Sequence, residues 1–117
     1  MKIAVVGSRT FDDYNLLKET LDKFYPKVTL IVSGGAKGAD SLAERYAKGE
    51  GIPTLIFKPD WKKHGKSAGF VRNKDIVSAA DTVIAFWDGE SKGTNNSIDQ
   101  AIQLGKKVMI IRFTPNL

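Results

Sequence analysis

Glycines, hydroxyl groups and basic side chains follow several apolar runs of this sequence, in patterns typical of phosphate binding. The clearest is Ser33–Asp40, with the sequence SGGAKGAD, which joins an apolar run to a helical pattern. Glycines clear the space above a helix N-terminus, where free backbone N–H groups and the helix dipole favour an anion. Lys37 adds a positive charge. We therefore predict phosphate binding here, ahead of the alternative that the glycines serve only tight helix–strand packing.

This segment matches neither of two familiar nucleotide motifs. The spacing of a P-loop is missing, and so is the dinucleotide fingerprint G-x-G-x-x-G. Gly65-Lys66-Ser67 matches the last three residues of a P-loop, but the position five residues before Gly65, where a P-loop has glycine, is Asp60. Asp40 falls near the first helical turn, where it could cap the helix. Because its charge would repel a phosphate, we expect it to hold the loop or a ribose hydroxyl.

Two other segments show the same order of apolar run and glycine. Gly7-Ser8-Arg9-Thr10 offers a tight turn, two hydroxyls and a guanidinium fork that matches phosphate, although a polar turn with a solvated arginine fits equally well. Further along, Gly93 and Thr94 precede a helical pattern, with Thr94 expected to cap it. Two such anion sites facing one cleft would hold the phosphate and sugar of a nucleotide.

The segment Lys58–Asn73 is long for a connection between a strand and a helix and is rich in aromatic and basic residues. Such a loop often forms one wall of a site. Trp61 is able to stack on a base, although covering the core edge is the commoner role of one tryptophan. His64 is expected to be a hydrogen-bond partner within the loop. Arg72 is expected to start a helix, where a positive charge opposes the dipole, so its side chain is predicted to serve a phosphate.

These residues need a framework, and the apolar pattern predicts a parallel sheet. Continuous apolar runs are typical of strands buried on both faces. The expected strands are Ile3–Gly7, Thr29–Ser33, Thr54–Phe57, Thr82–Phe86 and Lys107–Phe113. The helical patterns between them run from Tyr14 to Phe24 after Asp12 or Asp13, from Ala39 to Ala47 before Gly49 and Gly51, from Asn73 to Ala80, and from Ile98 to Ile102 before Gly105.

This alternation predicts an α/β, Rossmann-like three-layer sandwich. We expect a five-stranded parallel sheet in the order 3-2-1-4-5, with right-handed crossovers and helices on both faces. In such folds a ligand binds beyond the carboxyl ends of the strands, at the switch point of strand order.

Composition limits the classes of function. The 117 residues suit a single domain, 1–117, and the absence of cysteine excludes disulfide and thiolate chemistry. One histidine cannot build a histidine-based zinc site, and no metal or cofactor is expected. No signal peptide and no membrane span of ~20 apolar residues is evident, so we expect a soluble, cytoplasmic protein. The net charge of +5 favours an anionic partner.

Taken together, the segments resemble the small YspA-like members of the SLOG superfamily, a nucleotide-binding Rossmann-like group. The matching segments are GSR at Gly7–Arg9, SGGAKGAD at Ser33–Asp40, DWKKHGKSAGFVRN at Asp60–Asn73, FWDG at Phe86–Gly89 and SKGT at Ser91–Thr94. The superfamily includes the LOG phosphoribohydrolases, the DNA-processing proteins of natural transformation, and sensor domains for NAD-derived signals. The resemblance implies the fold and the place of the cleft, and by analogy a homodimer.

The resemblance also points away from catalysis. In the hydrolases, a helix arginine and a glutamate three residues after a Gly-Thr pair carry the reaction. Arg72 matches the arginine, but Ser97 stands at the glutamate position, and serine cannot replace a carboxylate. Asp88, Glu90 and Asp99 remain open as substitutes. We therefore predict no catalytic residues and at most a trace of hydrolase activity.

The first hypothesis is a protein that binds a phosphate-bearing nucleotide or an NAD- or ADP-ribose-derived ligand, as sensor, carrier or sequestering protein. The alternatives are a nucleoside-monophosphate N-glycosidase and a single-stranded nucleic-acid-binding protein that uses its two tryptophans for stacking. The predicted ligand-binding residues are Gly7, Ser8, Arg9, Ser33, Gly34, Gly35, Ala36, Lys37, Gly38, Asp40, Arg72, Asn73, Trp87, Asp88, Gly93, Thr94 and Asn95.

Overall fold

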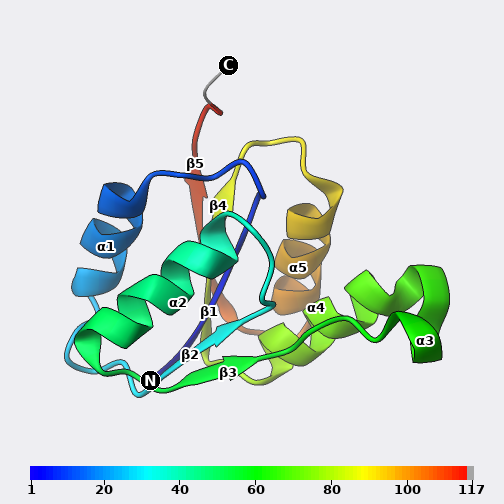
Figure 1. Ribbon diagram of the computed structural model, residues 1–117, viewed down its shortest axis with the longest axis horizontal. Coiled ribbons are helices and arrows are strands. Elements are labelled where there is room, and N and C mark those ends of the chain that lie inside the picture. The colour runs from blue at the N-terminus through cyan, green and yellow to red at the C-terminus, as the bar shows by residue number, and fades with distance from the viewer. Residues whose placement is uncertain (116–117) are drawn as a thin grey trace.

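The computed structural model describes residues 1–115, which form a five-stranded parallel sheet with flanking helices (Figure 1). The strands are β1 Lys2–Gly7, β2 Leu30–Ser33, β3 Thr54–Ile56, β4 Thr82–Trp87 and β5 Lys107–Arg112. Their order is β3-β2-β1-β4-β5, and every neighbouring pair is parallel. The predicted fold class and strand order are thus confirmed.

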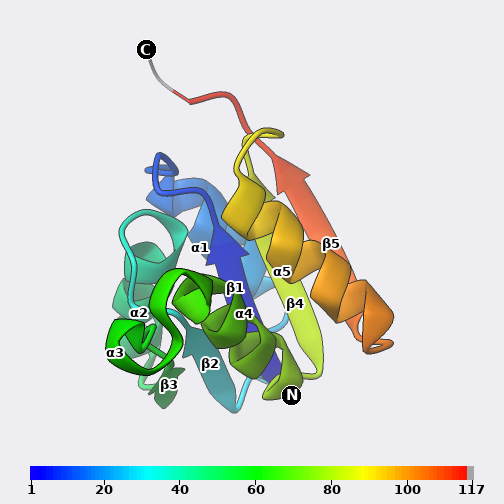
Figure 2. The same cartoon turned by 90° about the vertical axis from the view of Figure 1, so that its right-hand side faces the viewer.

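Helices cover both faces of this sheet, which makes the three layers (Figures 1 and 2). The helices are α1 Tyr14–Asp22, α2 Ala39–Glu50, α3 Trp61–His64, the 3-10 turn η1 Gly65–Ser67, α4 Ala68–Ser78 and α5 Lys92–Gln103. Helices α1 and α2 pack on one face, and α4 and α5 pack on the other. None of these helices in residues 1–115 has the length and apolarity needed to cross a membrane.

The core divides at the sheet because successive side chains of a strand point to opposite faces. On β1, Ile3 and Val5 belong to the cluster under α1 and α2, and Ala4 and Val6 belong to the cluster under α4 and α5. All four are buried, as a central strand of a parallel sheet requires.

The expectation that all five strands are buried on both faces is wrong at the two sheet edges. In β3 all three residues are exposed, and in β5 Met109 and Ile110 are exposed. An edge strand has a neighbour on one side only, so an apolar run does not by itself show burial.

The segment Lys58–Asn73 is not one long loop, because it contains α3, η1 and the beginning of α4. Helix α4 starts at Ala68 and not near Asn73, so Arg72 is its fifth residue. The expectation that Arg72 starts a helix is therefore wrong, and the argument from the helix dipole does not apply to it. Arg72 lies instead in the second turn of α4.

A second correction concerns the start of α5. Its N-cap is Ser91, whose Oγ accepts a hydrogen bond from the Thr94 backbone N–H at 3.5 Å, so Thr94 is not the cap. Ser91 Oγ also lies 3.1 Å from Thr94 Oγ1. The first turn of α5 therefore presents Gly93 and Thr94 from inside the helix.

The switch point of strand order lies between β1 and β4, which are hydrogen-bonded neighbours. The chain leaves β1 toward α1 on one face and leaves β4 toward α5 on the other (Figure 1). The loops after these two strands diverge, which opens a crevice at the carboxyl ends of the strands.

Candidate functional site

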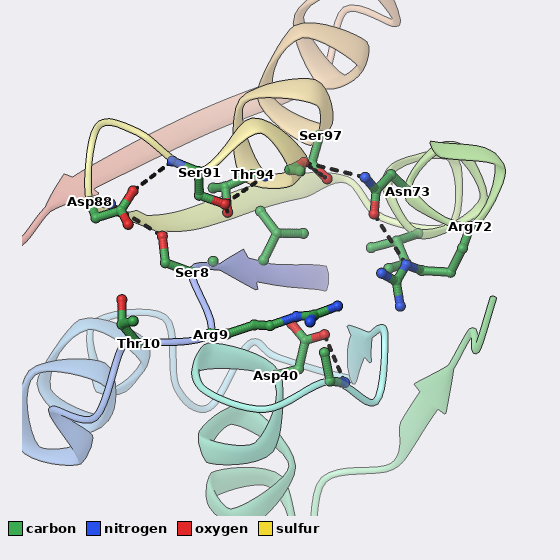
Figure 3. Close-up of a pocket in the computed structure, with 15 residues that line it drawn as sticks. Ser8, Arg9, Thr10, Asp40, Arg72, Asn73, Asp88, Ser91, Thr94 and Ser97 are labelled. Atoms are coloured by element: carbon green, nitrogen blue, oxygen red, sulfur yellow. Dashed lines mark hydrogen bonds between the residues drawn. The ribbon is translucent and has the colours of Figure 1, made fainter. Parts of the chain in front are cut away.

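A cavity of about 430 Å³ lies in this crevice (Figure 3). Its lining is mostly polar and comes from the ends of β1 and β4, the loop before α2, and helices α4 and α5. The lining residues are Val6, Gly7, Ser8, Arg9, Thr10, Ala36, Asp40, Arg72, Asn73, Ile76, Asp88, Ser91, Gly93, Thr94 and Ser97.

The loops around this first cavity are tied to one another through Ser8. Its backbone N–H donates to the carbonyl oxygen of Phe86 at 3.0 Å, and its Oγ accepts from the Asp88 N–H at 3.3 Å (Figure 3). The loop before α2 packs against the same point, because a Cβ on Gly38 would clash with the Ser8 carbonyl oxygen. Gly38 also has a φ of 81°. Only glycine fits this contact and this backbone conformation.

The role of Gly7 in the structure differs from the predicted role in a tight turn. It is the last residue of β1 and does not have a positive φ. A Cβ there would lie 2.6 Å from the Cβ of Ala39 and 2.7 Å from the carbonyl oxygen of Phe86. The glycine thus lets α2 approach the sheet closely, and this approach brings the start of α2 to the cavity.

Two arginines, Arg9 and Arg72, face each other across the cavity (Figure 3). Arg72 donates from Nε to Asn73 Oδ1 at 3.1 Å and from Nη1 to the Gly34 carbonyl oxygen at 2.9 Å, which fixes its guanidinium. Burial lowers the pKa of Arg72, the charge of Asp40 opposes this effect, and the charge of Arg9 lowers the pKa further. In the described chain neither arginine has a carboxylate oxygen within 4.0 Å. An anion between them would relieve this repulsion.

Asn73, which positions Arg72, also connects α4 to α5. Its Nδ2 donates to the carbonyl oxygen of Gly93 and to Oδ1 of Asn96, both at 3.3 Å. The side chain is buried. One asparagine therefore orients the guanidinium and fixes the distance between the two helices that line the cavity.

Asp40 is only 7% exposed, and its Oδ2 accepts a hydrogen bond from the Ala36 backbone N–H at 3.2 Å (Figure 3). Burial raises the pKa of Asp40 to about 6, against the opposing effects of the Ala36 hydrogen bond and the Arg72 charge. Asp40 therefore holds the glycine-rich loop, which is one of the two roles expected for it.

The other carboxylate of the cavity, Asp88, is occupied within its own loop. Its Oδ1 accepts from the backbone N–H groups of Ser91 at 2.8 Å and Glu90 at 2.9 Å. These bonds, that from Ser91 foremost, lower the pKa of Asp88, so it stays ionised. The exposed Glu90 and Asp99 line neither this cavity nor the one beside it.

Ser97 occupies the helix position where the resemblance expects a glutamate. It is buried, lines the cavity, and donates from Oγ to the carbonyl oxygen of Gly93 at 3.3 Å. A neutral hydroxyl bonded to its own helix cannot supply the negative charge of a carboxylate. In residues 1–115 no group of three or more His, Cys, Asp or Glu side chains is arranged to hold a metal ion.

A second cavity of about 600 Å³ adjoins the first on the side of β3 and α3. It shares Arg9, Ala36, Arg72, Asn73 and Gly93 with the first. Its other lining residues are Gly34, Gly35, Lys58, Pro59, Trp61, Lys66, Gly69 and Phe70. The shared arginines make the two cavities parts of one cleft.

The structure brings together most of the predicted ligand-binding residues. Those that line the first cavity are Gly7, Ser8, Arg9, Ala36, Asp40, Arg72, Asn73, Asp88, Gly93 and Thr94. Gly34 and Gly35 line the second cavity. Those that line neither are Ser33, Lys37, Gly38, Trp87 and Asn95.

Two of the residues outside the lining have structural partners. Ser33 Oγ donates to Glu44 Oε2 at 2.9 Å and accepts from the Gly35 N–H at 3.3 Å. Trp87 donates from Nε1 to the Ser91 carbonyl oxygen at 3.1 Å, and its ring packs against the second core cluster. Both residues support the loops around the cleft without lining it.

The predicted set omits several lining residues. In the first cavity these are Val6, Thr10, Ile76, Ser91 and Ser97, and in the second they are Lys58, Pro59, Trp61, Lys66, Gly69 and Phe70. A serine three residues before Thr94 is a recognisable N-cap signal for Ser91. The second group lies within Lys58–Asn73, the segment whose aromatic and basic residues predict a wall of a site, but the sequence does not show which of its side chains face the cleft.

Comparison with known proteins supports the fold and the family. The chain is 34% identical to the Gene 61 protein of Mycobacterium phage D29 over 121 aligned residues, which cover 96% of this chain and 95% of that protein. It is structurally similar to DNA processing protein A of Streptococcus pneumoniae, with a TM-score of 0.81 and 23% identity. The similar region covers 97% of this chain but only 50% of that protein.

A second structural neighbour is DNA processing protein A of Helicobacter pylori, described with a single-stranded DNA binding mode. Its TM-score is 0.75 at 22% identity, over 99% of this chain and 68% of that protein. The model of one family, the YspA, cpYpsA-related SLOG family, matches residues 1–64, which contain the first strand and the glycine-rich loop. The chain therefore belongs to the YspA, cpYpsA-related SLOG family.

Proposed function

We propose that this protein acts as a cytoplasmic, one-domain binding protein for a phosphate-bearing nucleotide or an NAD- or ADP-ribose-derived ligand, as sensor, carrier or sequestering protein. The observation that carries the proposal is the pair of guanidinium groups of Arg9 and Arg72. They face each other across the switch-point crevice and have no carboxylate within 4.0 Å in residues 1–115. A guanidinium group binds a phosphate through two parallel hydrogen bonds, so this pair of arginines fits a phosphate better than an uncharged, apolar ligand.

The rest of the first cavity fits a sugar. Hydroxyl groups of Ser8, Thr10, Ser91 and Thr94 line it, and each can donate and accept hydrogen bonds. The volume of about 430 Å³ falls within the range of small-molecule sites. Phosphate binding by arginines and sugar binding by hydroxyls together describe a nucleotide.

The same cavity argues against N-glycosidase activity. A glycosidic bond breaks through a positively charged sugar, which a nearby carboxylate stabilises. Asp40 and Asp88 are the two carboxylates among the lining residues, and each already accepts loop backbone hydrogen bonds. We therefore propose binding without cleavage.

Isothermal titration calorimetry with AMP, ADP-ribose and NAD tests the proposal. Losing charge-assisted hydrogen bonds to a phosphate weakens affinity by about 10- to 150-fold. The Arg72→Ala variant is therefore expected to bind by this factor more weakly whichever of the three ligands the parent binds. Arg72→Lys is expected to retain only part of the parent affinity, because an ammonium group cannot form the bidentate hydrogen bonds of a guanidinium. The control is Arg45→Ala, which removes an arginine that packs on the Tyr14 ring at 3.9 Å and lines neither cavity. Unchanged affinity in Arg72→Ala would contradict the proposed site.

The second cavity favours a second candidate, single-stranded nucleic-acid binding. Its lining holds four cations and an exposed tryptophan, Trp61, and no Asp or Glu. One structural neighbour is described with a single-stranded DNA binding mode. Binding of fluorescent dT10 as a function of salt tests this candidate, because several phosphate contacts make affinity fall steeply with salt concentration. A flat salt profile, or no binding at low salt, would exclude it. Sedimentation of the same samples tests the predicted homodimer.

A further inference from the structure

Part of the wall of the second cavity is built from elements that contribute nothing to the core. Neither α3 nor η1 contains a buried residue. Trp61, the first residue of α3, is 58% exposed, and Phe70 on α4 is 52% exposed, yet both line this cavity. Two large aromatic side chains at one opening, outside the core, form an apolar surface available to a ring system.

The charges around this surface are all positive. Arg9, Lys58, Lys66 and Arg72 line the second cavity, whereas its lining has no Asp or Glu. In the part of the chain that the structure describes, none of the four has an ion-pair partner within 4.0 Å. The first cavity differs, because two carboxylates accompany its two arginines. The second cavity is therefore the more favourable of the two for further negative charge.

The two arginines belong to both cavities, so a phosphate held between them has one cavity on each side. We propose that the cleft binds a dinucleotide, meaning two nucleosides joined through phosphate. The linking phosphate lies at Arg9 and Arg72, the first nucleoside occupies the hydroxyl-lined cavity, and the second base stacks on Trp61 and Phe70. This inference rests on the proposed function and narrows its ligand class.

The geometry and the chemistry of the second cavity agree with this assignment. Its volume of about 600 Å³ lies within the range of small-molecule sites without any contribution from the first cavity. Aromatic side chains bind any base through its π-face, so recognition of the second ring depends little on which base it is. Lys58 and Lys66 add positive charge for the phosphate chain.

Calorimetry with matched ligands tests the inference. AMP supplies one nucleoside, NAD supplies two joined by pyrophosphate, ADP-ribose lacks the second base, and pdApdA supplies two joined by a phosphodiester. Stacking of one base contributes about 5- to 150-fold in affinity, so at least one of NAD and pdApdA is expected to bind tighter than AMP and ADP-ribose by this factor. Trp61→Ala and Phe70→Ala are expected to reduce that advantage while AMP affinity stays the same.

Two control variants accompany these measurements. Ile102→Ala removes a large exposed side chain that lines neither cavity, and Lys62→Ala removes a positive charge of α3 that lines neither. Because Trp61 and Phe70 are exposed, urea denaturation is expected to give all four variants the stability of the parent within about 0.5 kcal/mol.

The outcomes separate the inference from the proposed function. If AMP binds through Arg72 but no dinucleotide binds tighter, or if Trp61→Ala weakens AMP and NAD equally, the inference is wrong and the proposed function stands. If none of the four ligands binds, both are wrong. If dT10 binds tightly but neither dinucleotide does, the inference is wrong and the nucleic-acid candidate is favoured.

Discussion

Replacing Asp40 by asparagine is expected to stabilise the protein at neutral pH, although it removes a negative charge that favours the charged form of Arg72. Asp40 is 7% exposed, and burial raises its pKa from the ordinary value of 3.8 to about 6. At about 1.4 kcal/mol per pKa unit, this difference corresponds to about 3 kcal/mol. The penalty applies to the charged carboxylate, which asparagine replaces with a neutral group of the same shape.

The sign follows from proton binding in the two states. The folded protein binds the Asp40 proton more tightly than the unfolded chain does, so the Asp40 contribution to the free energy of unfolding falls as pH rises from about 4 to about 6. Above pH 6 to 7 the loss is complete and constant. Asp40→Asn is therefore expected to gain up to about 3 kcal/mol at pH 7.5 and little at pH 4. The new side-chain oxygen can still accept the Ala36 hydrogen bond, so the loop is retained.

Urea denaturation at half-unit steps from pH 4 to 8 measures this effect as the difference in free energy of unfolding between variant and parent. The control is Asp99→Asn, which neutralises an exposed carboxylate of α5 and is expected to change stability by less than about 0.5 kcal/mol. A difference that does not grow between pH 4 and 7, or a variant less stable than the parent at pH 7.5, would refute the reasoning. In that case the attraction of Arg72 would outweigh the cost of burying the carboxylate.

Two other predictions concern the cleft. Gly34→Ala is expected to weaken nucleotide binding measured by calorimetry, because the added Cβ would lie 2.7 Å from Nη1 of Arg72. The control is Gly49→Ala, whose added Cβ meets open space. This control is expected to gain about 0.5–1 kcal/mol of stability without a change in binding. The parent is expected to release at most a trace of adenine from AMP, as measured by chromatography, and brisk release would contradict the binding role. Ser97→Glu tests whether the remaining site is still arranged for that reaction, in which case release begins.

The central part of the fold was predictable because strong local patterns determine it. The buried strands β1 and β4 were predicted to within one residue at each end, since a continuous apolar run has few alternatives in an α/β chain. Asp13, one of two cap candidates, does cap α1, with its Oδ1 accepting from the Leu16 N–H at 3.0 Å. Caps and apolar runs act over a few residues, so the sequence shows them directly.

For the second wall of the cleft, the sequence indicates that Lys58–Asn73 faces the site but not the helices that this segment contains. The start of α4 carries the exposed Phe70, so the apolar period marked only the half of this helix around Ile76 and Val77. Helix α3 buries nothing, and its one local signal is Asp60, whose Oδ1 accepts from the Lys63 N–H at 3.1 Å. Hydrophobic periodicity indicates which face of an element is buried, and a segment that buries no side chains shows no such periodicity.

Tolerance to substitution is therefore divided unevenly between the two walls of the cleft. A change at Ser8, at Gly38 or at a buried residue of β1 or β4 costs folding stability. A change in α3 or η1 leaves the core untouched, because nothing there is buried. Sequence drift or laboratory evolution can thus explore new side chains from Trp61 to Ser67 at almost constant stability, except at Gly65, where a φ of 58° favours glycine. Members of one family can keep the same arginine pair and still diverge in what the outer wall admits.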